Sequence, residues 1–154
     1  MNPLSLHGDA FTELILEVFR VNRLLLEAGD QLTKPVELSS ARWQVLGVVE
    51  HGPIPVAHVA RIMGLTRQSV QQTADSLAAD GLIAYSENPH HRRAKLMTMT
   101  AKGREALDYV QEQHADWANQ LGETHSLEDL RTAVQVLRQI RESLDQNPQP
   151  EANA

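Results

Sequence analysis

Residues 55–81 of the chain read PVAHVARIMGLTRQSVQQTADSLAADG. Its first part has the i, i+3, i+4, i+7 apolar spacing of a short helix, at Val56, Val59, Ala60 and Met63. Gly64 follows, and glycine adopts a left-handed turn conformation without steric cost. Thr66 is then a favourable N-cap for a second helix that ends at Gly81. The stretch therefore predicts a helix-turn-helix.

The exposed face of the predicted second helix carries long side chains with hydrogen-bond donors and no acid: Arg67, Gln68, Gln71 and Gln72. Base edges in a major groove suit such a surface, since Arg pairs with guanine O6/N7 and Gln with adenine N6/N7. We assign Arg67, Gln68 and Gln71 to base edges. Thr66 and Ser69, near the helix N-terminus, are assigned to phosphates. The alternative is an ordinary helical hairpin with a solvated, glutamine-rich face.

A β-hairpin is predicted directly after this helix. Residues 82–86 (LIAYS) and 95–99 (KLMTM) have the composition of strands, and residues 87–94 (ENPHHRRA) form the turn between them. A hairpin after a recognition helix is a wing, and an arginine at its tip can enter a minor groove. We assign Arg93 to the minor groove. Arg92 and Lys95 are assigned to phosphates. Thr100 caps the helix that follows.

The run from Gly81 to Gly103, GLI followed by ENPHHRRAKLMTMTAKG, resembles the wing signature of the MarR (multiple antibiotic resistance regulator) family of winged-helix transcription factors. The resemblance extends over most of the chain and is most specific over residues 60–104. It implies that the position of Gln72, often Arg in the family, touches the DNA backbone, so the neutral side chain here makes a weaker contact. Family wings usually carry acids at the positions of Asn88 and His91.

The same resemblance implies a ligand-responsive repressor, often for phenolic or other aromatic compounds. The family pocket lies where dimerisation helices meet the winged domain, and Asn22, Trp43 and His58 are our candidates for its lining. Trp43 is first interpreted as a core anchor, and ligand stacking is the alternative. The chain has no cysteine, which excludes the family variant that senses peroxide through a reactive thiol.

Charge is unevenly distributed along the chain. The formal net charge is −6, yet residues 51–104 hold seven Lys or Arg and three Asp or Glu, a local net charge of +4. The remainder therefore carries −10. Because salt screens charges beyond about 8 Å, a bound phosphate responds to the local cationic charge. The acidic remainder is expected to face away from DNA.

Long apolar helices are predicted on both sides of the winged region. Residues 9–32 carry two apolar stripes, and the last helix, capped by Ser126, places leucines and valines at a 3–4–3 spacing. We therefore predict dimerisation helices at 1–34 and 101–146, a winged helix-turn-helix domain at 35–100, and a disordered tail at 147–154. Residues 1–8 are expected to be loose. Ser39 or Ser40 caps a helix that ends near Glu50, and Ile54 adds a short third strand.

The expected fold class is mainly α with a small β-wing (α+β). The expected function is a homodimeric, sequence-specific regulator that binds double-stranded DNA at a pseudo-palindromic operator. The alternative is a winged-helix protein–protein module that never touches DNA, which steep salt dependence of duplex binding would exclude.

Other functional classes are disfavoured by what the sequence does not contain. No Ser/His/Asp ordering, Gly-rich phosphate loop or metal-ligand spacing stands out, so we expect no enzyme, cofactor or metal site. No signal peptide or membrane-length apolar run is present, which predicts a cytoplasmic protein with no membrane partner. Histidine titrates near neutrality. Protonation of His90 and His91 is therefore a hypothesis for stronger DNA binding below about pH 6.5, against the alternative of two solvated loop residues.

Overall fold

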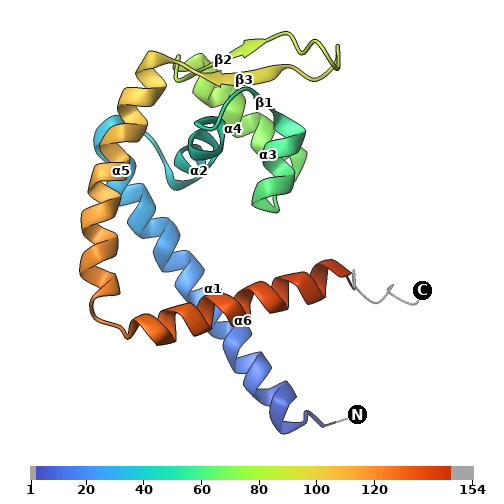
Figure 1. Ribbon diagram of the computed structural model, residues 1–154, viewed down its shortest axis with the longest axis vertical. Coiled ribbons are helices and arrows are strands. Elements are labelled where there is room, and N and C mark those ends of the chain that lie inside the picture. Colours follow the sequence, from blue (N-terminus) through green and yellow to red (C-terminus); the bar gives the residue numbers. More distant parts are fainter. Residues whose placement is uncertain (1–2, 147–154) are drawn as a thin grey trace. The chain divides into compact units, whose positions relative to one another are not determined.

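The computed structural model describes residues 3–146 of the 154-residue chain. The described part is mostly helical with one small antiparallel sheet, so the predicted α+β class is confirmed (Figure 1). A 3₁₀ turn at Lys34–Val36 separates the first two helices. In chain order the other elements are α1 (Leu6–Thr33), α2 (Ser40–Val49), β1 (Ile54–Pro55), α3 (Val56–Met63), α4 (Arg67–Ala79), β2 (Ile83–Ser86), β3 (Leu96–Met99), α5 (Ala101–Gly122) and α6 (Leu127–Gln146).

The helix-turn-helix forms as its sequence predicts. Gly64 ends α3 in the left-handed region at φ 65° and ψ 31°, where a side chain would be strained. The Thr66 hydroxyl then accepts from the backbone N–H of Ser69 at 3.2 Å, which caps α4. Helix α4 ends at Ala79 with Asp80 as its cap, and Gly81 follows with φ 73°. The two helices therefore begin and end through local contacts that the sequence encodes.

The sheet has the strand order β1-β3-β2, and both pairings are antiparallel. Ile54 pairs with Met97 in β1–β3, which confirms the predicted short third strand. Tyr85 pairs with Met97 in β2–β3, so this register fixes where the Tyr85 side chain leaves the sheet. Thr100 caps α5, since its hydroxyl accepts from the Gly103 N–H at 3.0 Å.

One hydrophobic core lies between helices α2, α3 and α4, the sheet and the first half of α5. Its largest fully buried side chains include Leu46, Leu77, Met97 and Leu107. Trp43 is half-buried and packs against this core, in agreement with its interpretation as a core anchor. The core holds α4 in place through its inner face and leaves the outer face available for a partner.

The expectation that residues 1–8 are loose is wrong for residues 6–8, which are helical. Helix α1 begins at Leu6, because the Ser5 hydroxyl accepts from the backbone N–H of Gly8 at 3.1 Å and caps it. The predicted start at residue 9 missed this cap. The predicted disordered tail, residues 147–154, lies outside the described residues.

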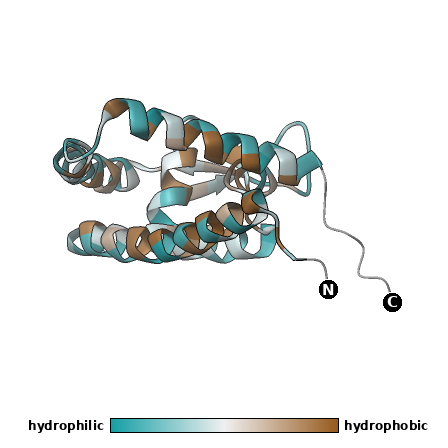
Figure 2. Ribbon diagram, turned by 90° about the horizontal axis from the view of Figure 1, so that it is seen from below, coloured by the Kyte–Doolittle hydropathy of each residue, from teal (hydrophilic) through white to brown (hydrophobic). Residues whose placement is uncertain are grey.

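The chain divides into two compact units at residues 113 and 114. The first contains the winged helix-turn-helix together with α1, and the second contains the end of α5 and all of α6. None of the α6 residues from Leu127 to Gln146 is buried. Figure 2 shows hydrophobic positions recurring along the helices. On α6 the exposed large apolar side chains are Leu127, Leu130, Val134, Val136, Leu137 and Leu144.

Candidate nucleic-acid interface

The recognition helix and the wing share one cleft. It has a volume of about 240 Å³ and lies between α4, the β2–β3 hairpin and the start of α3. Its polar lining comes from α4 and from the hairpin: Arg67, Gln71, Asp75, Tyr85, Arg93 and Lys95. The structure therefore brings together two of the residues assigned to base edges with two of the cations assigned to the wing.

The N-cap and the first two turns of α4 present the other DNA contacts predicted for this helix. Thr66, Arg67, Gln68, Ser69 and Gln72 are all exposed. The Ser69 hydroxyl donates to the Thr66 carbonyl at 3.0 Å, whereas the Thr66 hydroxyl serves as an acceptor in the cap. The Thr66 hydroxyl hydrogen thus remains available to a phosphate oxygen, and the free N–H groups of the first turn add a favourable dipole.

Gln71 is half-buried and is held by two neighbours on the cleft wall. Its Nε2 donates to Asp75 Oδ1 at 2.8 Å and to the Tyr85 hydroxyl at 3.1 Å. The Tyr85 hydroxyl in turn donates to Asp75 Oδ1 at 2.8 Å. Burial, followed by the hydrogen bond to the Asp75 carboxylate, raises the pKa of Tyr85 to about 12. The three side chains form a closed triangle that ties the recognition helix to strand β2.

The wing tip is built from two tight turns. Asn88 Oδ1 accepts from the backbone N–H of His90 at 3.0 Å, and the Asn88 carbonyl accepts from the His91 N–H at 3.2 Å. Asn88 thereby orders the turn with its amide oxygen. His90, His91 and Arg92 are exposed. Their exposure keeps open the interpretation of the histidines as solvated loop residues.

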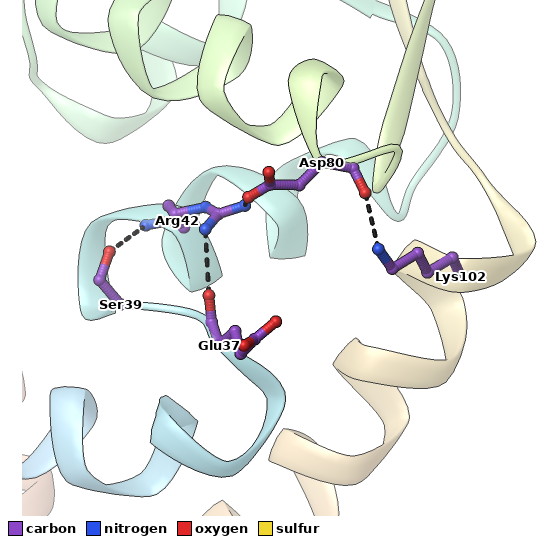
Figure 3. Close-up of polar contacts among 5 residues, drawn as sticks. All are labelled: Glu37, Ser39, Arg42, Asp80 and Lys102. Carbon is purple, nitrogen blue, oxygen red and sulfur yellow. Dashed lines mark hydrogen bonds and ion pairs between the residues drawn. The ribbon is translucent and has the colours of Figure 1, made fainter.

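The far end of the recognition helix is anchored by an arginine that the sequence did not single out. Arg42, on α2, contacts Asp80 Oδ2 at 2.5 Å and donates to the Glu37 carbonyl at 3.0 Å (Figure 3). Lys102, in the first turn of α5, donates through Nζ to the Asp80 carbonyl at 2.8 Å. Asp80 caps α4, so this contact set fixes the C-terminal end of the helix whose N-terminal end faces the wing cleft.

Sequence reasoning could not find this anchor, because Arg42 and Asp80 are 38 residues apart and neither stands in a motif. Glu37 adopts a left-handed conformation at φ 55°, which turns its carbonyl toward Arg42. The Arg42 side chain is 16% exposed, whereas that of Asp80 is 55% exposed. The pair is therefore partly screened by solvent.

The three candidate effector residues lie on three different helices. Asn22 is exposed on α1, Trp43 is half-buried on α2, and His58 is exposed on α3. None of them lines the wing cleft. Their assignment to an effector pocket stays a prediction.

Residues 3–146 contain neither a candidate metal-binding cluster nor a candidate membrane-spanning helix. No group of three or more His, Cys, Asp or Glu side chains there is placed to hold a metal ion. No helix in that range is long and apolar enough to span a bilayer.

This arrangement of a helix-turn-helix, an arginine-bearing wing and a cationic cleft between them defines a winged-helix protein. Residues 37–94 match the sequence profile of the MarR family. The uncharacterized protein Rv2011c from Mycobacterium tuberculosis is 32% identical over 133 residues, which cover 86% of this chain and 93% of that relative.

Two solved structures resemble the chain over most of its length. Sco5413, a MarR family transcriptional regulator from Streptomyces coelicolor, has a TM-score of 0.78 at 25% identity and covers 92% of this chain and 100% of its own. The transcriptional repressor CouR, bound to a 23-mer DNA duplex, has a TM-score of 0.76 at 22% identity. The match covers 91% of this chain and 99% of the CouR chain. The chain belongs to the MarR family of winged-helix transcription regulators.

Proposed function

We propose that the protein is a homodimeric, sequence-specific regulator that binds a pseudo-palindromic operator in double-stranded DNA and acts as a ligand-responsive repressor. The observation that carries this proposal is the shared cleft, which places Arg67 of α4 opposite Arg93 and Lys95 of the wing. A recognition helix reads the major groove while a wing arginine enters the minor groove next to it.

The charge distribution supports contact with DNA despite the acidic chain. The net charge of −6 hides a segment, residues 51–104, that carries +4. Within it Arg92, Arg93 and Lys95 are exposed on the wing. Each cation that neutralises a phosphate releases counterions, so affinity should fall steeply with salt. Thr66 and Ser69 serve as phosphate contacts at the helix start, with Gln68 at base edges and Gln72 as a weaker backbone contact.

The terminal helices supply the argument for a dimer. Helix α6 exposes an apolar face along its whole length, and α1 exposes Phe11, Phe19 and Leu24 among other large apolar side chains. So much exposed apolar surface on a soluble chain marks a contact surface. A second copy related by a two-fold axis would cover it and would set two recognition helices on half-sites roughly 34–36 Å apart.

An effector would act by favouring one arrangement of the two recognition helices. Its binding site is expected where the dimerisation helices meet the winged domain, with Asn22, Trp43 and His58 as candidates and a small aromatic compound as the ligand class. A ligand that prefers the non-binding arrangement lowers DNA affinity by its differential binding free energy, typically about 1–3 kcal/mol.

A winged-helix module that binds only proteins is the competing function, since a fold alone does not fix function. The two differ in one measurable property. Duplex affinity of a DNA-binding protein declines linearly on a log–log plot against salt, with a slope that counts the phosphates contacted.

The decisive experiment is selection of bound duplexes from a random pool, repeated with Arg93→Ala. We expect a palindromic site for the natural sequence. The variant should lose affinity, while most of its major-groove preference is kept because α4 is untouched. Arg20→Ala is the matched control, since Arg20 is an exposed arginine on α1 that pairs with Glu17. Failure to enrich any sequence, or a monomer at micromolar concentration, would contradict the proposal.

A further inference from the structure

The side-chain amide of Gln71 has two hydrogens, and both are engaged within the protein. One is donated to Asp75 Oδ1 at 2.8 Å and the other to the Tyr85 hydroxyl oxygen at 3.1 Å. A glutamine amide offers only these two donors, together with one carbonyl oxygen. Within the described residues the carbonyl oxygen, Oε1, makes no recorded hydrogen bond, so it is the part of the side chain that remains for a partner.

The chemistry of the neighbours fixes which end of the amide faces them. The Asp75 carboxylate only accepts hydrogen bonds, so the Gln71 atom beside it must be the nitrogen. The Tyr85 hydroxyl has one hydrogen, and it donates that hydrogen to Asp75 Oδ1 at 2.8 Å. The phenol oxygen is therefore left as an acceptor for Gln71. Reversing the amide would set its oxygen against the carboxylate and lose both bonds.

Three features keep this arrangement in place. The pKa of Tyr85 is raised to about 12, so the phenol keeps its proton at neutral pH. Tyr85 also lies in β2 opposite the fully buried Met97, which fixes its position in the sheet. Asp75 stands one helical turn after Gln71 on α4, so its carboxylate is already beside the amide. The triangle is thus present before DNA arrives.

We propose that Gln71 reads DNA through its carbonyl oxygen alone, as a hydrogen-bond acceptor for the exocyclic amino group of adenine or cytosine in the major groove. Asp75 and Tyr85 are positioning residues that hold the amide in this orientation. This inference rests on the proposed DNA-binding function. It replaces the bidentate adenine contact expected from sequence, since that contact needs a free amide N–H to reach N7.

The consequence is a particular kind of specificity. In the major groove adenine N6 and cytosine N4 are donors, whereas guanine O6 and thymine O4 are acceptors. An acceptor therefore favours A and C on one strand and disfavours G and T there. The operator position read by Gln71 should be degenerate between A and C, where a bidentate glutamine would select A alone.

The test begins by locating that position. Duplexes are selected with the natural sequence, with Gln71→Ala and with Gln44→Ala, a matched control at an exposed glutamine on α2 that lies outside the cleft. One symmetric pair of operator positions should lose its preference in Gln71→Ala and keep it in Gln44→Ala. With the natural sequence, those positions should hold A and C in comparable amounts.

Base analogues then separate acceptor-only reading from bidentate reading without altering the protein. At an adenine in that position, 7-deazaadenine lacks N7 and purine lacks the amino group. The natural protein should bind the 7-deazaadenine duplex as well as the adenine duplex. It should lose about threefold to tenfold in affinity for the purine duplex, the effect of one hydrogen bond. Equal losses with both analogues would overturn the inference.

Tyr85→Phe tests the positioning role, because it removes only the hydroxyl oxygen. One Gln71 N–H becomes free, so the selected positions should shift toward adenine, and binding should become sensitive to 7-deazaadenine. A variant that keeps the A/C mixture and ignores the analogue would overturn the role of Tyr85.

The result also separates this inference from the proposed function. Enrichment of an operator whose bases are unaffected by Gln71→Ala would overturn the inference and leave DNA binding intact. Failure of every form of the protein, controls included, to enrich any duplex would overturn both.

Discussion

Helix α4 buries Val70, Ala74 and Leu77 completely within its own chain, whereas helix α6 buries none of its residues from Leu127 to Gln146. Both helices are amphipathic. The first has its apolar face covered by the winged core, so its remaining face is polar and free to meet a polar partner such as DNA. The second exposes its apolar face, so it needs an apolar partner. Exposed surface on the same chain thus indicates two kinds of partner.

The largest expected effect compares one leucine from each helix. Leu77→Ala removes a fully buried side chain from the winged core and should lower the free energy of unfolding by about 2–5 kcal/mol. Leu137, on α6, is 44% exposed, so Leu137→Ala should instead weaken dimer association by about 1–3 kcal/mol. Urea unfolding and sedimentation equilibrium measure the two quantities. A Leu137→Ala dimer as tight as the natural one would remove α6 from the interface.

A second prediction concerns how closely the winged unit is packed. A Cβ built on Gly103 would lie 2.0 Å from the Leu82 carbonyl oxygen, a backbone atom with little freedom to move. Gly103→Ala should therefore destabilise the fold by about 1–3 kcal/mol. The matched control is Gly47→Ala, in the middle of α2, where a Cβ meets nothing within 4 Å. That change should be neutral or stabilising by up to about 1 kcal/mol. Thermal unfolding of both variants decides the point, and equal effects would contradict it.

A smaller effect is expected from the ion pair at the end of the recognition helix. A double-mutant cycle with Arg42→Met and Asp80→Asn should give a coupling free energy of about 0.5–1 kcal/mol, since solvent screens the Asp80 side. The more exposed pair of Arg20 and Glu17, with side chains 67% and 59% exposed, is the control and should give a smaller coupling free energy. Coupling that is no greater for Arg42 and Asp80 than for the control pair would remove their role as an anchor.

A pH dependence is also expected at Tyr85. The folded protein raises the pKa of this phenol from 10.0 to about 12, so folding favours the protonated form. The associated stability is fully present below pH 10 and is lost as the pH rises toward 12. The natural protein should therefore lose stability over that window more than Tyr85→Phe does, as measured by urea midpoints at each pH. Parallel curves for the two proteins would show that the Tyr85 phenol contributes nothing to this dependence.

The elements of the winged unit were predictable because their signals are local. The Thr66 cap, the left-handed Gly64 and the strands on either side of the arginine-bearing turn depend on residues only a few positions apart. The one clear error, the start of α1, arose from overlooking Ser5 as a cap. The orientation of individual side chains was harder to predict from the sequence. Gln71 was correctly placed on the outer face of α4, yet its amide hydrogens are engaged by Asp75 and Tyr85.

The helix-turn-helix, the wing and the separation of a cationic middle from acidic, apolar ends could be predicted before any fold was known, because they depend on spacings of three or four residues and on local charge. Three contacts became apparent only in the folded chain: Tyr85 with Gln71, Arg42 with Asp80, and Leu82 with Gly103. The first contact joins residues 14 positions apart, and the second joins residues 38 positions apart. The third joins Gly103 of α5 to the residue just before strand β2. Hydrogen bonds and close approaches of this kind depend on where the packed core sets each element.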